Sequence, residues 1–436
     1  MNKVISAVLI VIIIVLGCNK DKEDNPNPAN TGYKIEIIRG DKQADTLGEM
    51  LTDSIIVKAT KDGKLLKKAS VLFETSGCDR NLSTEQTVMG WSGETGYRWR
   101  LNGIVGKQTL KIVLLDSLRA RVDSVTAEAT GIKPAHGWYR SSCTPELGKP
   151  TVNSFCRLSS GRLIAAFNTF DYPYYSDDNA VTWHPLTTFP LGSDLLFIIK
   201  LIATSSDEIF AATLNNGLYY SPDGGLTWSL RSAGITDLRS FTDMAYTGSG
   251  KLIYTTYIGG VYLSEDKGLS WTSLSVNTTS SDRYYYPTET ADGVLYLVGD
   301  AGNMYRSADG GHQWSKSLGA SNVRAMYVDR NGYIYQSITS NYAELHRSVD
   351  NGATWSLIYT APAIPGVYPE IHKMRQENNG RFYFYYYGGG LISTEDFNTF
   401  TSINPALTEQ SRTYITDRNG NIIIGTAFDG IYYNLP

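Results

Sequence analysis

The stretch that decides the fold is SPDGGLTW, residues 221–228, because the chain repeats it. Good copies are SDDNAVTW from residue 176, SEDKGLSW from 264, SADGGHQW from 307 and SVDNGATW from 348, and a decayed copy, STEDFNTF, starts at 393. The steps between the copies are 45, 43, 43, 41 and 45 residues. Short β-type segments such as KLIYTTY and YIYQSIT lie between them. A period of this length with four short strands per unit predicts a β-propeller.

The number of copies and the last residues of the chain predict seven blades. Six copies mark six blades, and GIYYN at 430–434 aligns with GLYYS at 217–221, so the chain stops where a seventh copy would begin. The segment HGWYRSS at 136–142 aligns with the strand that follows each copy. We therefore predict that residues 137–436 form a seven-bladed propeller closed by an N-terminal outer strand, which removes the open edges of the sheet.

The repeated phrase resembles the Asp box, or BNR repeat, Ser-x-Asp-x-Gly-x-Thr-Trp. The resemblance implies a turn between the third and fourth strands of each blade. In such a turn the carboxylate accepts backbone N–H groups, Gly takes a positive φ, and Trp is buried between blades. A calcium loop, the alternative, needs a stepped series of oxygen ligands. The constant carboxylates are therefore predicted to be structural: Asp178, Asp223, Asp266, Asp309 and Asp350.

The N-terminus carries the signals of an exported protein. MNK is a basic start, and VISAVLIVIIIVL has the length of a signal-peptide core. The sequence Val15-Leu16-Gly17-Cys18 resembles the lipobox of bacterial lipoproteins, which implies residues 1–17 as signal peptide and a lipid on Cys18; an ordinary signal peptide is the alternative. The polar residues 18–32 should be a flexible tether. Their acidic cluster resembles the export signal of Bacteroidota surface lipoproteins, so we expect an outer-membrane lipoprotein at the cell surface, with a periplasm-facing position as the alternative.

Residues 33–131 read as an all-β domain without a site. SIIVKATKDGKLLKKASVLFET places an Asp-Gly turn between two strand segments, which is a strong hairpin signal. About seven short strands in this length suggest a β-sandwich. The phrases here and in GETGYRWRLNGIVGKQTLKIVL resemble bacterial Ig-like domains of the invasin and intimin type. The resemblance implies a spacer or adhesive module, and no catalytic residues transfer with it.

The composition argues against nucleic-acid, metal and cofactor binding. A net charge of −4 over 436 residues argues against nucleic acid as a partner. The five histidines show no metal-ligand spacing, and no Gly-rich phosphate loop is present, so no metal and no cofactor are predicted. Of the three further cysteines, Cys78, Cys143 and Cys156, the last two lie close enough in sequence to pair, but spacing alone leaves the disulfide open.

The predicted ligand face lies opposite the repeated turns, at the loops that enter the inner strands. Basic side chains there would form a cationic ring suited to carboxylate or phosphate, unless each pairs with a local acid. Aromatic side chains would offer a platform for sugars or polymers, unless they only serve strand packing. The candidate residues are Arg239, Arg283, Arg324, Arg412, Tyr285, Tyr342 and Phe428.

Two classes of function follow from related propellers. Blades that each carry one copy of the repeated phrase resemble those of photosystem II assembly factors and sortilin-type receptors, which bind proteins or peptides. They also resemble the blades of tandem-propeller xyloglucanases. We expect a lipid-anchored envelope protein that binds a glycan or an envelope protein. The alternative is a sialidase-like glycoside hydrolase, which needs an Arg triad, a Tyr nucleophile with a Glu base, and an Asp acid. Glu289, Glu344 and Glu370 are predicted to lie near the ligand face. The missing Phe-Arg-Ile-Pro motif and the number of blades count against the hydrolase.

Overall fold

The structure is a computed structural model, and its description covers only part of the chain. The described residues are 32–47, 50–75, 85–101, 106–132, 137–141, 151–168, 172–191, 197–236, 238, 241–258, 260–276, 283–316, 322–339, 342–362, 370–377, 379–386, 390–403, 411–427 and 430–435. Within these ranges every regular element is a strand, so the all-β prediction is confirmed. The described part holds no helix that is long and apolar enough to cross a membrane.

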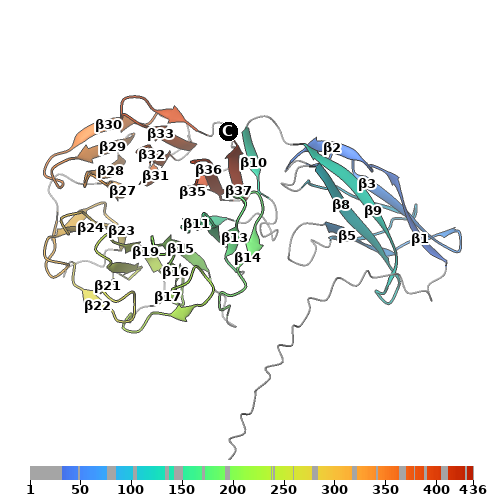
Figure 1. Cartoon of the computed structure of the whole chain (residues 1–436), viewed down its shortest axis with the longest axis horizontal. Helices are drawn as coiled ribbons and strands as arrows, with labels where there is room; N and C mark the ends of the chain where they lie inside the picture. Colours follow the sequence, from blue (N-terminus) through green and yellow to red (C-terminus); the bar gives the residue numbers. More distant parts are fainter. Residues whose placement is uncertain are drawn as a thin grey trace, which may run out of the picture.

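Two sheets form the first part of the chain (Figure 1). The first sheet contains β1 (Tyr33–Arg39), β3 (Ile55–Lys61), β4 (Lys64–Leu65) and β7 (Glu94–Tyr97). The second sheet has the order β2 (Gln43–Thr46), β9 (Arg121–Ile132), β8 (Gly106–Leu115), β5 (Ser70–Thr75) and β6 (Glu85–Val88). Every second residue of β3 is buried from Ile55 to Ala59, which is the alternation of a strand with one face on a core.

One hydrophobic core joins these two sheets. Ile55 and Val57 from the first sheet belong to the same buried cluster as Phe73 and Ile112 from the second. The hairpin predicted from Lys-Asp-Gly is present between β3 and β4. Asp62 and Gly63 both have positive φ, of 50° and 76°, which is the geometry of a two-residue type I′ turn.

Seven four-stranded antiparallel sheets follow (Figure 1). Six of them run in simple chain order. The first three are β11 (Val152–Arg157), β12 (Leu163–Phe167), β13 (Tyr174–Ser176) and β14 (His184–Pro185); β15 (Ile198–Ala203), β16 (Ile209–Thr213), β17 (Leu218–Ser221) and β18 (Ser229–Leu230); and β19 (Phe241–Tyr246), β20 (Leu252–Thr256), β21 (Val261–Ser264) and β22 (Thr272–Leu274). The next three are β23 (Tyr284–Glu289), β24 (Leu295–Gly299), β25 (Met304–Ser307) and β26 (Ser315–Lys316); β27 (Val323–Val328), β28 (Ile334–Thr339), β29 (Ala343–Ser348) and β30 (Ser356–Thr360); and β31 (Ile371–Gln376), β32 (Phe382–Tyr386), β33 (Gly390–Thr394) and β34 (Thr401–Ser402).

The seventh sheet joins the two ends of this region. Its order is β10 (Gly137–Arg140), β37 (Ile431–Leu435), β36 (Ile422–Thr426) and β35 (Ser411–Thr416). Gly137 pairs with Leu435 and Arg140 with Tyr432, so the N-terminal strand is the outer strand of a sheet whose other strands come from the end of the chain. This pairing covers an edge that β37 would otherwise expose.

Side-chain packing closes the sheets into a ring. The second strand is fully buried in most sheets, as in β16 and β36. Adjacent inner strands lie together from β11 to β31, and β35 lies beside β11. Ile423 and Ile431 of the last sheet share a hydrophobic cluster with Val152 and Trp183 of the first. Burial on both faces explains why the second strands read as continuous apolar runs rather than alternating ones.

Candidate functional site

In the repeated turn, the Asp carboxylate accepts hydrogen bonds from donors of the same turn. In residues 221–228, Oδ1 of Asp223 accepts the Ser221 hydroxyl and the Thr227 N–H, each at 2.8 Å, and Oδ2 accepts the Thr227 hydroxyl at 2.6 Å. The Ser221 Oγ in turn accepts the Gly225 N–H at 2.8 Å. The same serine-to-carboxylate and glycine-to-serine bonds recur at the turns that begin at residues 264, 307 and 348. Each carboxylate is therefore satisfied inside its own turn.

Glycine and tryptophan fit these turns against a neighbouring sheet. Gly225 has a φ of 95°, and a Cβ at this position would lie 3.0 Å from Leu186 of the preceding sheet. The indole N–H of Trp228 donates to the Gly225 carbonyl at 3.1 Å, and the Trp228 ring meets Phe189 edge-on. Residues 221–228 therefore act as a packing element between sheets.

Hydrogen bonds place these turns at one end of the ring and the predicted ligand face at the other. The Gly224 N–H donates to the backbone carbonyl of Asp207, in the turn that follows β15. At the opposite end, the Asp300 N–H donates to the carbonyl of Arg283, directly before β23 begins. We call this second end, where the inner strands begin, the mouth.

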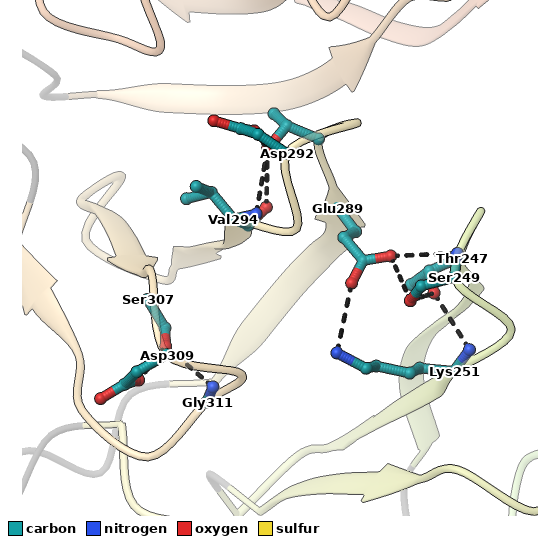
Figure 2. Close-up of polar contacts among 10 residues, drawn as sticks. Thr247, Ser249, Lys251, Glu289, Asp292, Val294, Ser307, Asp309 and Gly311 are labelled. Carbon is teal, nitrogen blue, oxygen red and sulfur yellow. Dashed lines mark hydrogen bonds and ion pairs between the residues drawn. The ribbon is translucent and has the colours of Figure 1, made fainter.

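One acidic candidate lies at the wrong end. The sequence prediction placed Glu289 near the mouth, but it is the last residue of β23 and lies on the same side as the repeated turns. Figure 2 shows its carboxylate between the neighbouring sheet's Ser249 and Lys251, at 2.6 Å from the Ser249 hydroxyl and 3.4 Å from the Lys251 Nζ. The prediction was wrong because a six-residue strand carries its two ends to opposite faces. Glu289 ties two sheets together.

At the mouth, Arg283 is held over an aromatic ring. Its guanidinium carbon lies 3.4 Å from the centroid of Tyr257, whose hydroxyl it also contacts, and its Nε lies 3.5 Å from the Asp300 carboxylate. About a third of the Arg283 side chain, 35%, stays exposed. Burial, and then Asp300, raise the pKa of the neighbouring Tyr285. Arg283 therefore pairs with a local acid, as the alternative interpretation expected, but solvent still reaches its side chain.

Arg324 belongs to a second charged group. Its Nε lies 3.9 Å from Oε1 of Glu370, and Oε2 of Glu370 lies 3.4 Å from His372. Within the described residues the Arg324 Nε has no hydrogen-bond partner, and 38% of the side chain is exposed. Burial, and then the charge of Lys373, lower the pKa of His372 to about 4. His372 is therefore neutral at physiological pH.

A third charged group lies on the innermost strands. Lys200 of β15 and Asp243 of β19 form an ion pair at 2.5 Å. Asp243 also accepts the N–H groups of Met244, at 2.8 Å, and of Tyr286, at 2.9 Å. Burial alone would raise the pKa of Asp243, but Lys200 and these hydrogen bonds outweigh it and keep the pKa below its usual value. Asp243 is therefore an anion bound by three groups from three segments.

The predicted site residues that the structure describes lie at one end of the ring. Arg283, Arg324 and Arg412 stand at the beginnings of β23, β27 and β35, Tyr285 lies two residues after Arg283, and Tyr342 lies exposed in the connection from β28 to β29. Arg239, Phe428 and Cys18 lie outside the described residues. Cys156 is a buried free thiol whose pKa burial raises to about 12, and Cys143 is again outside the described ranges. No group of three or more possible metal ligands occurs in the described part of the chain.

Sequence reasoning missed the charged residues on the inner strands. Lys200, Asp243 and Lys373 each occupy the third position of an inner strand, where the other sheets carry uncharged residues. A signal existed in two of them, because IIKLIA and FTDMAY each place one charge inside an otherwise uncharged strand, whereas IHKMRQ carries two charges. Aligning the inner strands of the repeat would have shown it. Tyr257 was missed because it lies in an irregular connection, from β20 to β21.

Comparison with known proteins supports the fold. A model named DUF6242 beta propeller domain matches residues 244–370. The C-terminal region is a β-propeller. No curated protein sequence matches the chain.

Three solved structures are similar to the chain. YCF48 from Cyanidioschyzon merolae has a TM-score of 0.51 at 13% identity, covering 68% of this chain and 98% of its own. YCF48 bound to D1 peptide has a TM-score of 0.54 at 12% identity, with 70% and 98% covered. A GH74 enzyme from Niastella koreensis has a TM-score of 0.50 at 16% identity, with 88% of this chain and 58% of the enzyme covered. At these identities the likeness concerns the fold alone.

Proposed function

We propose that the chain is a lipid-anchored binding protein of the bacterial cell envelope, which captures a glycan or an envelope protein at the propeller mouth. The lipobox-like segment ending at Cys18 and the polar tether after it support the anchor. The two-sheet region, which resembles bacterial Ig-like domains in sequence, would act as a spacer. The mouth would then be presented away from the membrane.

The finer architecture belongs to the same proposal. We infer that the seven four-stranded sheets are seven blades, with β10 completing the last one. We also infer that the repeated turns are Asp boxes with a structural role, since each carboxylate is bound inside its own turn. A binding role for the turns would require free oxygen ligands.

The observation that carries the function is the charge at the mouth. Five cationic side chains and several carboxylates lie there among the described residues, and two of the arginine side chains are more than one-third exposed. Exposed Tyr257 and Tyr342 lie on connections at the same end. Cations beside flat aromatic rings suit acidic or extended ligands. The charged residues are Lys200, Arg283, Arg324, Lys373, Arg412, Asp243, Asp300 and Glu370.

The similar structures include both a peptide-binding protein and an enzyme. One YCF48 structure holds a D1 peptide, which fits capture of a protein segment on such a fold. The Niastella koreensis relative is an enzyme, which keeps the hydrolase as the second candidate. The sequence lacks the Phe-Arg-Ile-Pro motif of sialidases, which favours binding over hydrolysis.

The test combines a glycan array with a crosslinked pull-down from the native envelope. The double variant Arg283→Glu/Arg324→Glu should lose at least about tenfold in capture, because its charge would repel an acidic ligand. The matched control is Arg381→Glu, which also breaks one surface ion pair, with Glu395, but before β32 at the opposite end. A sialyl or other glycoside reporter tests for hydrolysis in the same preparations.

Each outcome separates the candidates. Loss of capture in the double variant but not in the control supports the mouth as the binding face. Equal capture by all folded variants overturns that assignment. Turnover of a glycoside reporter by the native chain would replace the binding proposal with the hydrolase.

A further inference from the structure

Two large apolar side chains stand exposed at the tips of turns in the two-sheet region. Trp91 is 76% exposed and Leu118 is 86% exposed. A backbone hydrogen bond of 3.0 Å closes the turn 90–93 around Trp91, and one of 3.1 Å closes the turn 116–119 around Leu118. Each tip is therefore held by its own backbone while its side chain remains open to solvent.

Strand pairing places both turns at the same end of this region. Ser70, the first residue of β5, pairs with Val88 on one side and with Leu115 on the other, and each turn follows one of these two partners. Val88 is itself 59% exposed, and Leu65 of β4 is 45% exposed. Leu65 lies against the Trp91 turn, because a Cβ at Gly93 would come within 3.1 Å of its side chain. Exposed apolar side chains gathered at one end in this way indicate an interaction surface.

Basic residues outnumber acidic ones at this end. We define its turns and connections, which we call the basal turns, as residues 61–69, 88–93 and 116–120. Five basic residues minus two acidic ones give them a net charge of +3, in a chain whose net charge is −4. The ammonium groups of Lys67 and Lys68 lie 5.6 and 5.3 Å from the centre of the Trp91 ring. The charged residues of the basal turns are Lys61, Asp62, Lys64, Lys67, Lys68, Asp116 and Arg119.

The chain enters the two-sheet region at this same end. The Asp62 N–H, in the hairpin between β3 and β4, donates to the Gly32 carbonyl at 2.8 Å. The 15 residues from Cys18 to Gly32 span at most about 50 Å when fully extended. A lipid on Cys18 would therefore keep the basal turns close to the membrane surface. The chain leaves for the propeller from the opposite end, because β9 runs antiparallel to β8 and ends at Ile132.

We infer that the basal turns dock on an anionic lipid surface, with Trp91 and Leu118 at the level of the headgroups and the lysines facing lipid phosphates. The inference rests on the proposed lipid anchor for its location, and it adds a second contact with the membrane. Tryptophan and lysine side chains are both typical of membrane–water interfaces. One lipid chain holds a protein only reversibly, whereas a lipid chain with a basic patch holds it stably.

A lipid surface fits the basal turns better than a protein does. Their apolar side chains stand on separate tips, and a fluid lipid surface can close around each of them. A protein partner would need one continuous patch of matching shape. A second copy of the same end would bring two groups of positive charge together, which is unfavourable.

The experiment sediments a chain of residues 19–436 with vesicles made of equal parts phosphatidylglycerol and phosphatidylcholine. This chain has no signal peptide and no lipid but retains every described residue. The double variant Trp91→Ala/Leu118→Ala should lower the partition coefficient at least about tenfold, because two large apolar side chains no longer leave water. Lys67→Gln/Lys68→Gln should lower it about tenfold or more on these vesicles, but should have little effect on pure phosphatidylcholine.

The matched control is Ile38→Ala/Ile132→Ala. It also removes two exposed apolar side chains, but at the opposite end of the two-sheet region, so binding to vesicles should not change. The thermal midpoints of all three double variants should match that of the native chain, since every substituted side chain is exposed. A loss of vesicle binding then reports on the surface and not on the fold.

Each outcome decides the inference. Binding to anionic vesicles that falls in both basal-turn variants and not in the control supports it. No binding by the native chain, or equal binding by all variants, overturns it. A dimer in solution that Trp91→Ala/Leu118→Ala dissolves would also overturn it, because a second copy would then cover the basal turns.

Failure of the proposed function is measured separately. Mass spectrometry of the protein from its native envelope shows whether Cys18 carries a lipid, and capture by Arg283→Glu/Arg324→Glu tests the mouth. A missing lipid would contradict the proposed anchor, while vesicle binding by the chain without lipid still decides whether the basal turns bind a membrane.

Discussion

Charged side chains have different kinds of partner on the two faces of the propeller. On the face of the repeated turns, a carboxylate such as Asp223 is satisfied by donors within four residues of itself. Charged contacts between sheets occur on both faces, as between Lys251 and Glu289 on the face of the turns. At the mouth they join Lys200 to Asp243 and Arg324 to Glu370. The first pattern recurs from sheet to sheet, whereas the second occurs at single places. Repetition therefore marks what the fold needs, and under the proposed function the ligand would act at the unrepeated charges of the mouth.

The largest expected effect concerns the packing beside the turns. Trp183, at the end of the first copy, is fully buried in the cluster that joins the first and last sheets. Trp183→Ala should lower the free energy of unfolding by about 3–5 kcal/mol, because a large cavity opens at the ring closure. Denaturant unfolding measures it, with exposed Trp91→Ala as the control, expected to change stability by less than about 0.5 kcal/mol. Similar effects of the two substitutions would contradict the packing role.

A smaller effect is expected at the turn itself. Asp223→Ala removes the acceptor for the Ser221 hydroxyl and for both Thr227 donors. We expect a loss of about 1–2 kcal/mol in unfolding free energy, similar to the loss of a helix cap, with ligand affinity unchanged in the folded protein. Asp223→Asn should recover part of the loss, because an amide oxygen can still accept. If Asp223→Ala abolished binding without lowering stability, the contrast between the two faces would fail.

The smallest effect should appear on acidification. Hydrogen bonds from Ser270 lower the pKa of Asp266 to about 2, and those from Thr354 do the same for Asp350. A folded pKa below the unfolded value means that the native state binds fewer protons. The stabilisation is therefore complete above about pH 4 and is lost as the pH falls toward 2. The melting temperature of Asp266→Asn should decline less than that of the native chain over this range; an equal decline would mean that these carboxylates do not contribute.

The fold could be predicted from sequence because its signal is periodic. The spacing of the repeated phrase indicated a propeller, and the match between GIYYN and GLYYS indicated that a strand from 136–142 should lie beside the C-terminal strand, where β10 pairs with β37. In the first part of the chain, Asp62 and Gly63 predicted their hairpin from local turn chemistry alone. Local and repeated signals add together along the chain, so each copy reinforces the others.

The site could be predicted only in outline. Arg324 and Arg412 were found because their loops align. The partners of Arg283, Tyr257 and Asp300, come from connections between strands, which follow no period. Lys373 was missed because its strand, IHKMRQ, is mostly polar and carries a second charge, so that one more cation does not stand out. Glu289 was misplaced because it is the last residue of its inner strand, and the last residue lies on the opposite face of the propeller from the first. Its closeness in sequence to Arg283 does not place it at the mouth. Charges that meet across sheets depend on the closed ring, which a linear sequence does not display.

The most direct test of the contrast is capture from the native envelope by three folded proteins: the native chain, Asp223→Ala and Arg283→Glu/Arg324→Glu. Loss of capture by the double variant, with native capture by Asp223→Ala, is the predicted result, since the two arginines lie at the mouth and Asp223 lies in a turn that holds the fold. Native capture by the double variant together with lost capture by Asp223→Ala would contradict it, and would place the ligand on the face of the repeated turns.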